Sequence, residues 1–172
     1  PNPEGGYRDD PPASTGARVI ISDTDHLWGI GGNRQWVWLS FFRGLNPIFM
    51  DSYDGTVLER GAGTDWAEEI RTAMGLTRQV AGKIDLLKVV PSGHLSSSGY
   101  CLAHPDDAYL VYVPGEEPVT LDLGEAHGTF HTTWISALDG REEAGQLIEG
   151  GRQVSLSSPF GEGEAVVYLK KN

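Results

Sequence analysis

The chain has 172 residues, 39% of them hydrophobic, and a formal net charge of −11. This acidic balance argues against a nucleic-acid ligand, because phosphate binding requires clustered lysine and arginine. No apolar run approaches the roughly 20 residues that a membrane-spanning helix needs. The single cysteine, Cys101, excludes an intrachain disulfide, and its apolar neighbours indicate a buried strand thiol rather than a nucleophile.

The first 50 residues predict a strand–helix–strand unit. Residues 1–17 are rich in proline, glycine and acid, which indicates a tail or a long loop. The β-branched run over 18–21 is typical of a strand buried on both faces of a parallel sheet. Asn33 is placed to cap a helix over 34–43, and Gly44 is placed to end it. An apolar run at 48–50 predicts the second strand, which a right-handed crossover would bring parallel to the first.

Polar side chains gather where both of these strands end. Asp23, Asp25, His26 and Trp28 follow the first strand, and Asp51 follows the second. The carboxyl ends of parallel strands meet at one rim, where such proteins place their ligand sites, so we expect a functional site there. The alternative is that Asp23 and Asp25 only cap the loop and the next helix.

Other chemistries are weaker matches to the same segment. Asp23-Thr24-Asp25 resembles the motif of haloacid-dehalogenase-type phosphotransferases, but Leu27 stands where that motif has Thr or Val. The two carboxylates together with Asp51 have the oxygen ligands that Ca²⁺ or Mg²⁺ prefers, although nothing sets the ligand count. The glycines at 29–32 lack dinucleotide-loop spacing. We therefore predict neither a metal nor a cofactor.

In the rest of the chain, the spacing of apolar residues changes from a helical period to a period of two. Asp65 and Glu68 form a capping box for a helix over 65–84, in which Gly75 costs about 1 kcal/mol relative to alanine, so close packing is expected to require it. Residues 91–98 indicate a linker. Six strands are then predicted, which together indicate an antiparallel β-sandwich with Trp134 in its core. They cover 99–103, 108–113, 119–123, 129–135, 153–157 and 165–169.

Two blocks, SDTDHLWGIGGNRQWVWLSFFRGLNPIFMD and SSGYCLAHPDDAYLVYVPGEEPVTLDL, resemble the C-terminal part of the apiosidase-like glycoside hydrolases. In that family a (β/α)₈ barrel is followed by a β-sandwich labelled a collagen-binding domain. The resemblance implies an α/β plus all-β chain. Residues 1–90 would hold the last two β/α units of a TIM-type barrel, and residues 97–172 the sandwich. His104 stands where the family motif has Asn.

The resemblance also implies a function. The chain would be the C-terminal fragment of a secreted or periplasmic bacterial enzyme that hydrolyses O-glycosidic bonds in plant-type polysaccharide, without a cofactor. Asp25, or else Asp23, would be the catalytic carboxylate. The substrate-binding side chains would be His26, Trp28, Asp51 and Tyr53.

The implied general acid belongs to a barrel strand that precedes this chain. Glycoside hydrolysis needs that second carboxyl group, so we expect the chain alone to be inactive and to need the remainder of the barrel as its partner. We also expect it to expose apolar strand edges. The alternative function is a carbohydrate- or protein-binding sandwich that carries the barrel remnant as a scaffold.

Overall fold

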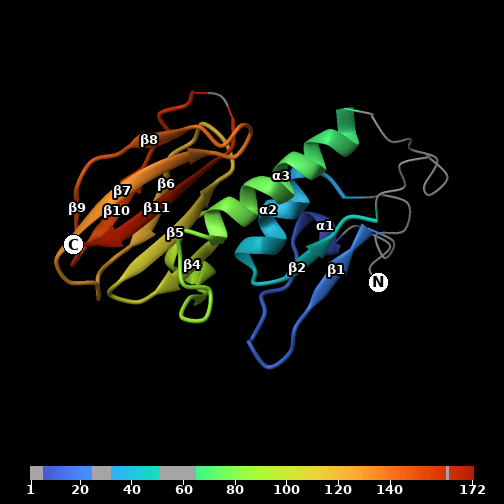
Figure 1. Ribbon diagram of the computed structural model, residues 1–172. Coiled ribbons are helices and arrows are strands. Elements are labelled where there is room, and N and C mark those ends of the chain that lie inside the picture. Colours follow the sequence, from blue (N-terminus) through green and yellow to red (C-terminus); the bar gives the residue numbers. More distant parts are fainter. Residues whose placement is uncertain (1–5, 25–31, 51–64, 162) are drawn as a thin grey trace. The chain divides into compact units, whose positions relative to one another are not determined.

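The computed structural model describes residues 6–24, 32–50, 65–161 and 163–172 (Figure 1). The chain separates into two compact units, which we call the N-terminal unit, Pro1–Val80, and the β unit, Ala81–Asn172. The resemblance places the boundary between the two parts closer to the C-terminus, between residues 90 and 97. Within the described ranges, no helix combines the length and the apolar character required to cross a lipid bilayer.

The N-terminal unit contains the predicted strand–helix–strand arrangement. Strand β1 (Ile21–Asp23) and strand β2 (Asn46–Ile48) pair in parallel, with helix α2 (Arg34–Phe42) between them in the chain. Both strands are displaced from their predicted positions. β1 begins after Ile20, whose carbonyl accepts the Asn46 N–H at 2.9 Å, so the parallel register begins beyond the predicted start.

The described residues before β1 are not a free tail. A short helix, α1 (Gly6–Asp9), is followed by contacts to the end of α2. Asp10 accepts a hydrogen bond from the Arg43 guanidinium at 3.0 Å, and the Ser14 N–H donates to the Arg43 carbonyl at 2.7 Å. These bonds make this segment a loop packed on the N-terminal unit.

The prediction that the first strand is buried on both faces is wrong. Val19 is 80% exposed and Ile21 is 59% exposed, and on the second strand Ile48 is 41% exposed. Successive side chains of a strand point to opposite faces, and Ser22, next to Ile21, is only 6% exposed, so one face of β1 is covered and the other is exposed. The expectation of exposed apolar strand edges agrees with the two-stranded β1–β2 sheet of the described residues.

Helix α2 begins and ends as its sequence predicts. The Asn33 side chain accepts the Trp36 N–H at 2.7 Å, which is the predicted N-cap. Arg43 is the C-cap, and Gly44 follows with φ of 72°, a left-handed conformation that glycine adopts without steric cost. The helix is largely buried, as its apolar residues indicated.

Helix α3 (Asp65–Ala81) is shorter than predicted and stops before Gly82. It buries one face, formed by Ala67, Ile70, Ala73, Leu76, Thr77 and Val80. The predicted packing requirement at Gly75 is wrong, because a Cβ built there would meet no atom within 4 Å. The proposed capping box depends on the Asp65 side chain, which lies outside the described structure.

The β unit consists of two antiparallel sheets, which confirms the predicted antiparallel strands (Figure 1). The larger sheet has seven strands in the order β3-β4-β5-β11-β7-β8, with β9 also paired to β7, and the smaller sheet pairs β6 with β10. Strands β3, β8 and β9 were not predicted. The strands are β3 (Val90–Pro91), β4 (Cys101–His104), β5 (Ala108–Val113), β6 (Val119–Asp122), β7 (Thr129–Ser136), β8 (Glu142–Ala144), β9 (Ile148–Glu149), β10 (Gln153–Leu156) and β11 (Ala165–Lys171).

Both sheets contribute to one apolar core. Val119 and Leu121 of β6 and Leu156 of β10 belong to the same buried cluster as residues of β4, β5, β7 and β11. Trp134 is part of this core, as predicted. Cys101 is fully buried, which confirms the predicted burial of this strand thiol, and the burial raises the pKa of the thiol to about 12.

The segment predicted as a linker, 91–98, is part of the β unit. Pro91 pairs with Leu102 in the ladder between β3 and β4, and residues Gly93–Leu95 form a 3₁₀ turn, η2. The Ser97 N–H donates to the Thr120 carbonyl at 3.0 Å. A serine-rich composition indicated a linker, but the backbone groups of this segment pair with strands of both sheets.

Candidate functional site

The predicted site lies at the carboxyl ends of β1 and β2. Asp23 is the last residue of β1, is half-buried and pairs in register with Ile48 of β2. It is the one candidate among the six that the structure places. The others lie outside the described residues; they are Asp25, His26, Trp28, Asp51 and Tyr53.

The residues next to this edge are held by specific contacts. The Ser22 hydroxyl accepts the Trp36 indole N–H at 3.2 Å, which ties β1 to α2. Thr24 is fully buried, and its hydroxyl accepts the Met50 N–H at 2.9 Å. Asp25 follows Thr24 in the chain and Asp51 follows Met50. The two candidate segments therefore leave the sheet from adjacent, hydrogen-bonded positions.

Glycine is required at position 32, directly before the N-cap of α2. A Cβ built at Gly32 would lie 2.4 Å from Cε3 of Trp36 and 3.0 Å from Cγ2 of Thr24. Because Trp36 is fully buried, its ring has no free space into which to move. The glycine-rich segment was expected to allow a tight turn, and at Gly32 the requirement is close packing.

Metal binding at this edge has no support in the described part of the chain. No group of three or more His, Cys, Asp or Glu side chains is placed there to hold an ion. Two of the three carboxylates considered for a cation, Asp25 and Asp51, lie outside that part.

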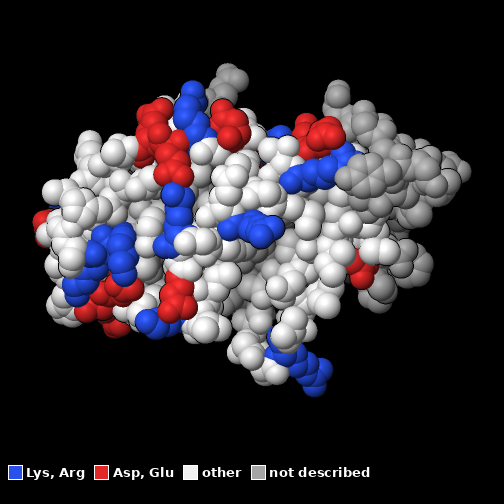
Figure 2. Space-filling view, viewed as in Figure 1, with Lys and Arg blue, Asp and Glu red and all other residues white. Residues whose placement is uncertain are grey.

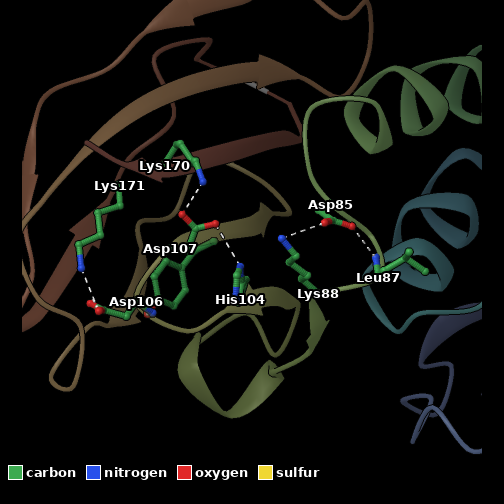
Figure 3. Close-up of polar contacts among 9 residues, drawn as sticks. Asp85, Leu87, Lys88, His104, Asp106, Asp107, Lys170 and Lys171 are labelled. Atoms are coloured by element: carbon green, nitrogen blue, oxygen red, sulfur yellow. Dashed lines mark hydrogen bonds and ion pairs between the residues drawn. The ribbon is translucent and has the colours of Figure 1, made fainter.

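A cluster of ion pairs in the β unit was missed by sequence reasoning (Figure 3). Asp106 contacts Lys171 at 2.9 Å, and Asp107 contacts Lys170 as well as Nδ1 of His104 at 3.1 Å. The hydrogen bonds from Lys171 and Lys170 lower the pKa of Asp106 and Asp107, respectively. The cluster joins the turn between β4 and β5 to the end of β11, so it serves to hold strands together.

The backbone of this turn is also constrained. Asp106 has φ of 61°, a left-handed conformation that few residues other than glycine adopt. Its carboxylate accepts the His127 N–H at 2.7 Å, and its own N–H donates to the Tyr109 hydroxyl at 3.1 Å. On the face seen in Figure 2, acidic and basic side chains of the β unit lie interspersed, in keeping with paired charges.

A second candidate site is a groove in the β unit. It has a volume of about 760 Å³ and lies between strand β10 and residues 144–148, which run from the end of β8 to the start of β9. Trp134, 7% exposed, is the one aromatic residue among its described lining. The described residues that line the groove all fall within 132–167, and no motif in that stretch predicted the groove.

Comparison with known proteins gives a structural likeness alone. No family model and no curated protein matches the chain. A solved structure described as a glycoside hydrolase matches 81% of this chain with a TM-score of 0.62 and 15% identity. A glycoside hydrolase family 5 structure from Bacteroides vulgatus ATCC 8482 also matches 81%, with a TM-score of 0.63 and 17% identity.

These identities establish a shared fold and nothing finer. The matched regions are 36% and 35% of the two solved chains, so this chain spans about a third of their length. The described elements are a parallel strand pair with helices and two antiparallel sheets. The chain therefore has a mixed helix-and-sheet fold that is found within glycoside hydrolases.

Proposed function

We propose that this chain is the C-terminal part of a glycoside hydrolase that acts on plant-type polysaccharide. In this proposal residues 1–90 belong to a (β/α)₈ barrel and residues 97–172 form the C-terminal β-sandwich of an apiosidase-like enzyme, secreted or periplasmic in a bacterium. The observation that carries it is the parallel β1–α2–β2 unit, with Asp23 at its carboxyl edge, in a fold found in glycoside hydrolases.

Asp25 is the proposed nucleophile or charge stabiliser for an oxocarbenium-like transition state. Its preference over Asp23 is supported by the anchoring of Thr24, which holds the backbone directly before Asp25. Asp23, in contrast, lies within the paired part of β1. The proposed sugar contacts are His26, Trp28, Asp51 and Tyr53.

The general acid is proposed to come from the remainder of the barrel. Glycoside hydrolysis uses a pair of carboxyl groups that flank the scissile bond, so a second group is needed beside Asp25. Exposed apolar residues on β1 and β2, such as Ile21 and Ile48, favour neighbouring strands outside this chain. The chain alone is therefore expected to release no sugar.

The test uses the polypeptide that carries the preceding barrel segment together with this chain. Reducing-sugar release from a panel of plant polysaccharides should fall by orders of magnitude in Asp25→Asn. It should be unchanged in the matched control Glu117→Gln, whose carboxyl is exposed in the connection between β5 and β6. Near-normal turnover by Asp25→Asn would remove this residue from the mechanism, and activity of residues 1–172 alone would contradict the fragment proposal.

A binding role for the β unit is the second candidate function, and the groove beside β10 favours it. Carbohydrate binding commonly uses an exposed aromatic ring as a stacking surface. Trp134 is 7% exposed and offers little ring face to a sugar. The groove is therefore better suited to a polypeptide than to a glycan.

A further inference from the structure

The groove beside β10 occupies the position of a missing strand. All four residues of β10 line one wall, and residues 144–148 line the other. No residue of β6 lines it, so the groove lies on the side of β10 that faces away from β6. Trp134 of β7 and Val167 of β11 contribute to the lining from the larger sheet. A strand in this groove would thus extend the two-stranded β6–β10 sheet over the larger sheet.

Strand β10 directs unpaired backbone groups into this groove. In an antiparallel ladder, alternate residues point their N–H and C=O groups to opposite edges. Thr120 of β6 uses both groups on the far edge, since its N–H donates to the Ser97 hydroxyl at 2.9 Å and its C=O accepts the Ser97 N–H at 3.0 Å. Ser155, which is opposite Thr120, therefore points its N–H and C=O away from β6.

The same alternation applies to Gln153, two residues before Ser155. Val154 lies between them and points its N–H and C=O toward β6. The hydrogen bonds between β6 and β10 therefore do not depend on the backbone groups of Gln153 and Ser155. No strand in the described part of the chain pairs with this second edge of β10. An unpaired strand edge of this kind is a template for one more strand.

The lining of the groove differs in charge from the rest of this acidic chain. The chain has 24 aspartates and glutamates, yet none of the described residues that line the groove is acidic. Arg152 is the one charged residue in that lining; it is exposed, and no ion pair joins its side chain to a described residue. A carboxylate is thus the charge that complements the groove.

Apolar side chains complete the features of a strand-binding site. Leu147 is 59% exposed, and Ile148 and Val154 are partly buried against the core. A peptide in extended conformation presents alternate side chains to one face, so every second residue would contact this surface. The four residues of β10 match a peptide strand of roughly 13 Å.

We propose that the groove binds an extended segment of another protein, which adds as a third strand to the β6–β10 sheet and places a carboxylate near Arg152. Its backbone would hydrogen-bond to Gln153 and Ser155. Alternate apolar side chains would contact Leu147, Ile148 and Val154. This binding site is independent of the proposed glycoside hydrolase activity, because it uses residues of the β unit alone.

The probe is a fluorescein-labelled peptide, acetyl-Thr-Val-Glu-Val-Thr-Val-amide, titrated with the full chain and followed by fluorescence anisotropy. Saturable binding is expected. A peptide with Lys in place of Glu should bind up to about fivefold more weakly, and high salt should reduce the difference because the Arg152 side chain is exposed. Hydrogen exchange at the amides of Gln153 and Ser155 should slow when the peptide is bound.

Two matched variants test the backbone contact. Ser155→Pro removes the N–H that faces the groove, and the ladder to β6 does not use that N–H. It should weaken peptide binding about fivefold or more, the effect of one lost hydrogen bond. Ser155→Ala keeps the N–H and should bind as the unmodified chain does. If Ser155→Pro perturbs folding, as monitored by circular dichroism, a peptide with alternate amides N-methylated tests the same contact on the unmodified chain.

Four results would overturn the proposal. The first is the absence of saturable binding by either peptide, and the second is equal affinity for Ser155→Pro and Ser155→Ala in folded protein. The third is protection of the Ser155 amide by plant-polysaccharide oligosaccharides and not by the peptides, which would assign the groove to a glycan. The fourth is self-association that Ser155→Pro abolishes, which would assign the edge of β10 to a second copy of the chain.

Discussion

Replacing Gly32 with alanine should destabilise the N-terminal unit, and the same replacement at Gly75 should stabilise it. The new Cβ at position 32 would lie 2.4 Å from Cε3 of Trp36, well inside ordinary van der Waals contact. The ring is fully buried, and its N–H is bonded to Ser22 at 3.2 Å. Since neither the ring nor Thr24 has free space, we expect the cost of an overpacked core, about 1–3 kcal/mol.

Gly75 provides the matched comparison. It lies in the interior of α3, and a Cβ there would meet nothing within 4 Å. Alanine at such a position reduces the conformational entropy of the unfolded chain and should stabilise the helix by about 0.5–1 kcal/mol. The two variants should therefore differ by about 1.5–4 kcal/mol in the free energy of unfolding.

Urea unfolding followed by tryptophan fluorescence measures this difference. Tryptophans at 28, 36, 38 and 66 all precede the β unit, so the signal reports chiefly on the N-terminal unit. The urea midpoint should fall in Gly32→Ala and rise in Gly75→Ala, with the slope unchanged. An unchanged or higher midpoint in Gly32→Ala would refute the close contact between the glycine and Trp36.

Three further outcomes follow from the charges, the thiol and the exposed strands. Because lysine partners lower the pKa of Asp106 and Asp107, their contribution to stability is complete above the unfolded pKa near 3.8 and is lost as the pH falls through the lower folded values. Thermal unfolding of Asp106→Asn/Asp107→Asn should accordingly depend less on pH in the acid range, and an unchanged dependence would contradict this. The buried Cys101 thiol, with its pKa raised to about 12, should react with a thiol reagent only on unfolding, so fast reaction in the folded state would disprove its burial. The isolated chain should self-associate in size-exclusion chromatography with light scattering, and Ile21→Lys/Ile48→Glu should shift it toward monomer; a monomeric unmodified chain would show that the exposed strand residues are harmless.

Helix α2 and most strands of the β unit were predictable because their signals are local. The Asn33 side chain accepts a hydrogen bond from the N–H of Trp36, three residues later, and Gly44 adopts a left-handed conformation. Both ends of α2 are therefore determined by residues in or next to the helix. Ala108–Val113 has the predicted bounds, since a continuous apolar run followed by a proline-glycine turn specifies where such a strand ends. The burial of Cys101 followed from the same strand pattern.

The candidate catalytic edge was predictable in part. The sequence placed Asp23 at the carboxyl end of a parallel strand, and the structure has it there. It did not reveal that Gly32 packs against Trp36 and Thr24, because these contacts depend on how α2 lies against β1. The positions of β1 and β2 were also displaced, since the register of a parallel pair is decided by bonds such as Asn46 to Ile20 across 26 residues.

The amino-acid sequence by itself determined the type of most elements, the caps of α2 and the antiparallel character of the β unit. Only the tertiary structure decided which edges remain unpaired. Residues Gln153–Leu156 have the same sequence pattern whether the second edge of β10 is covered or open. Whether it is open depends on strands β6, β7 and β11, which reach it from other parts of the chain. Pairing between distant strands is a property of the packed chain, and no local pattern encodes it.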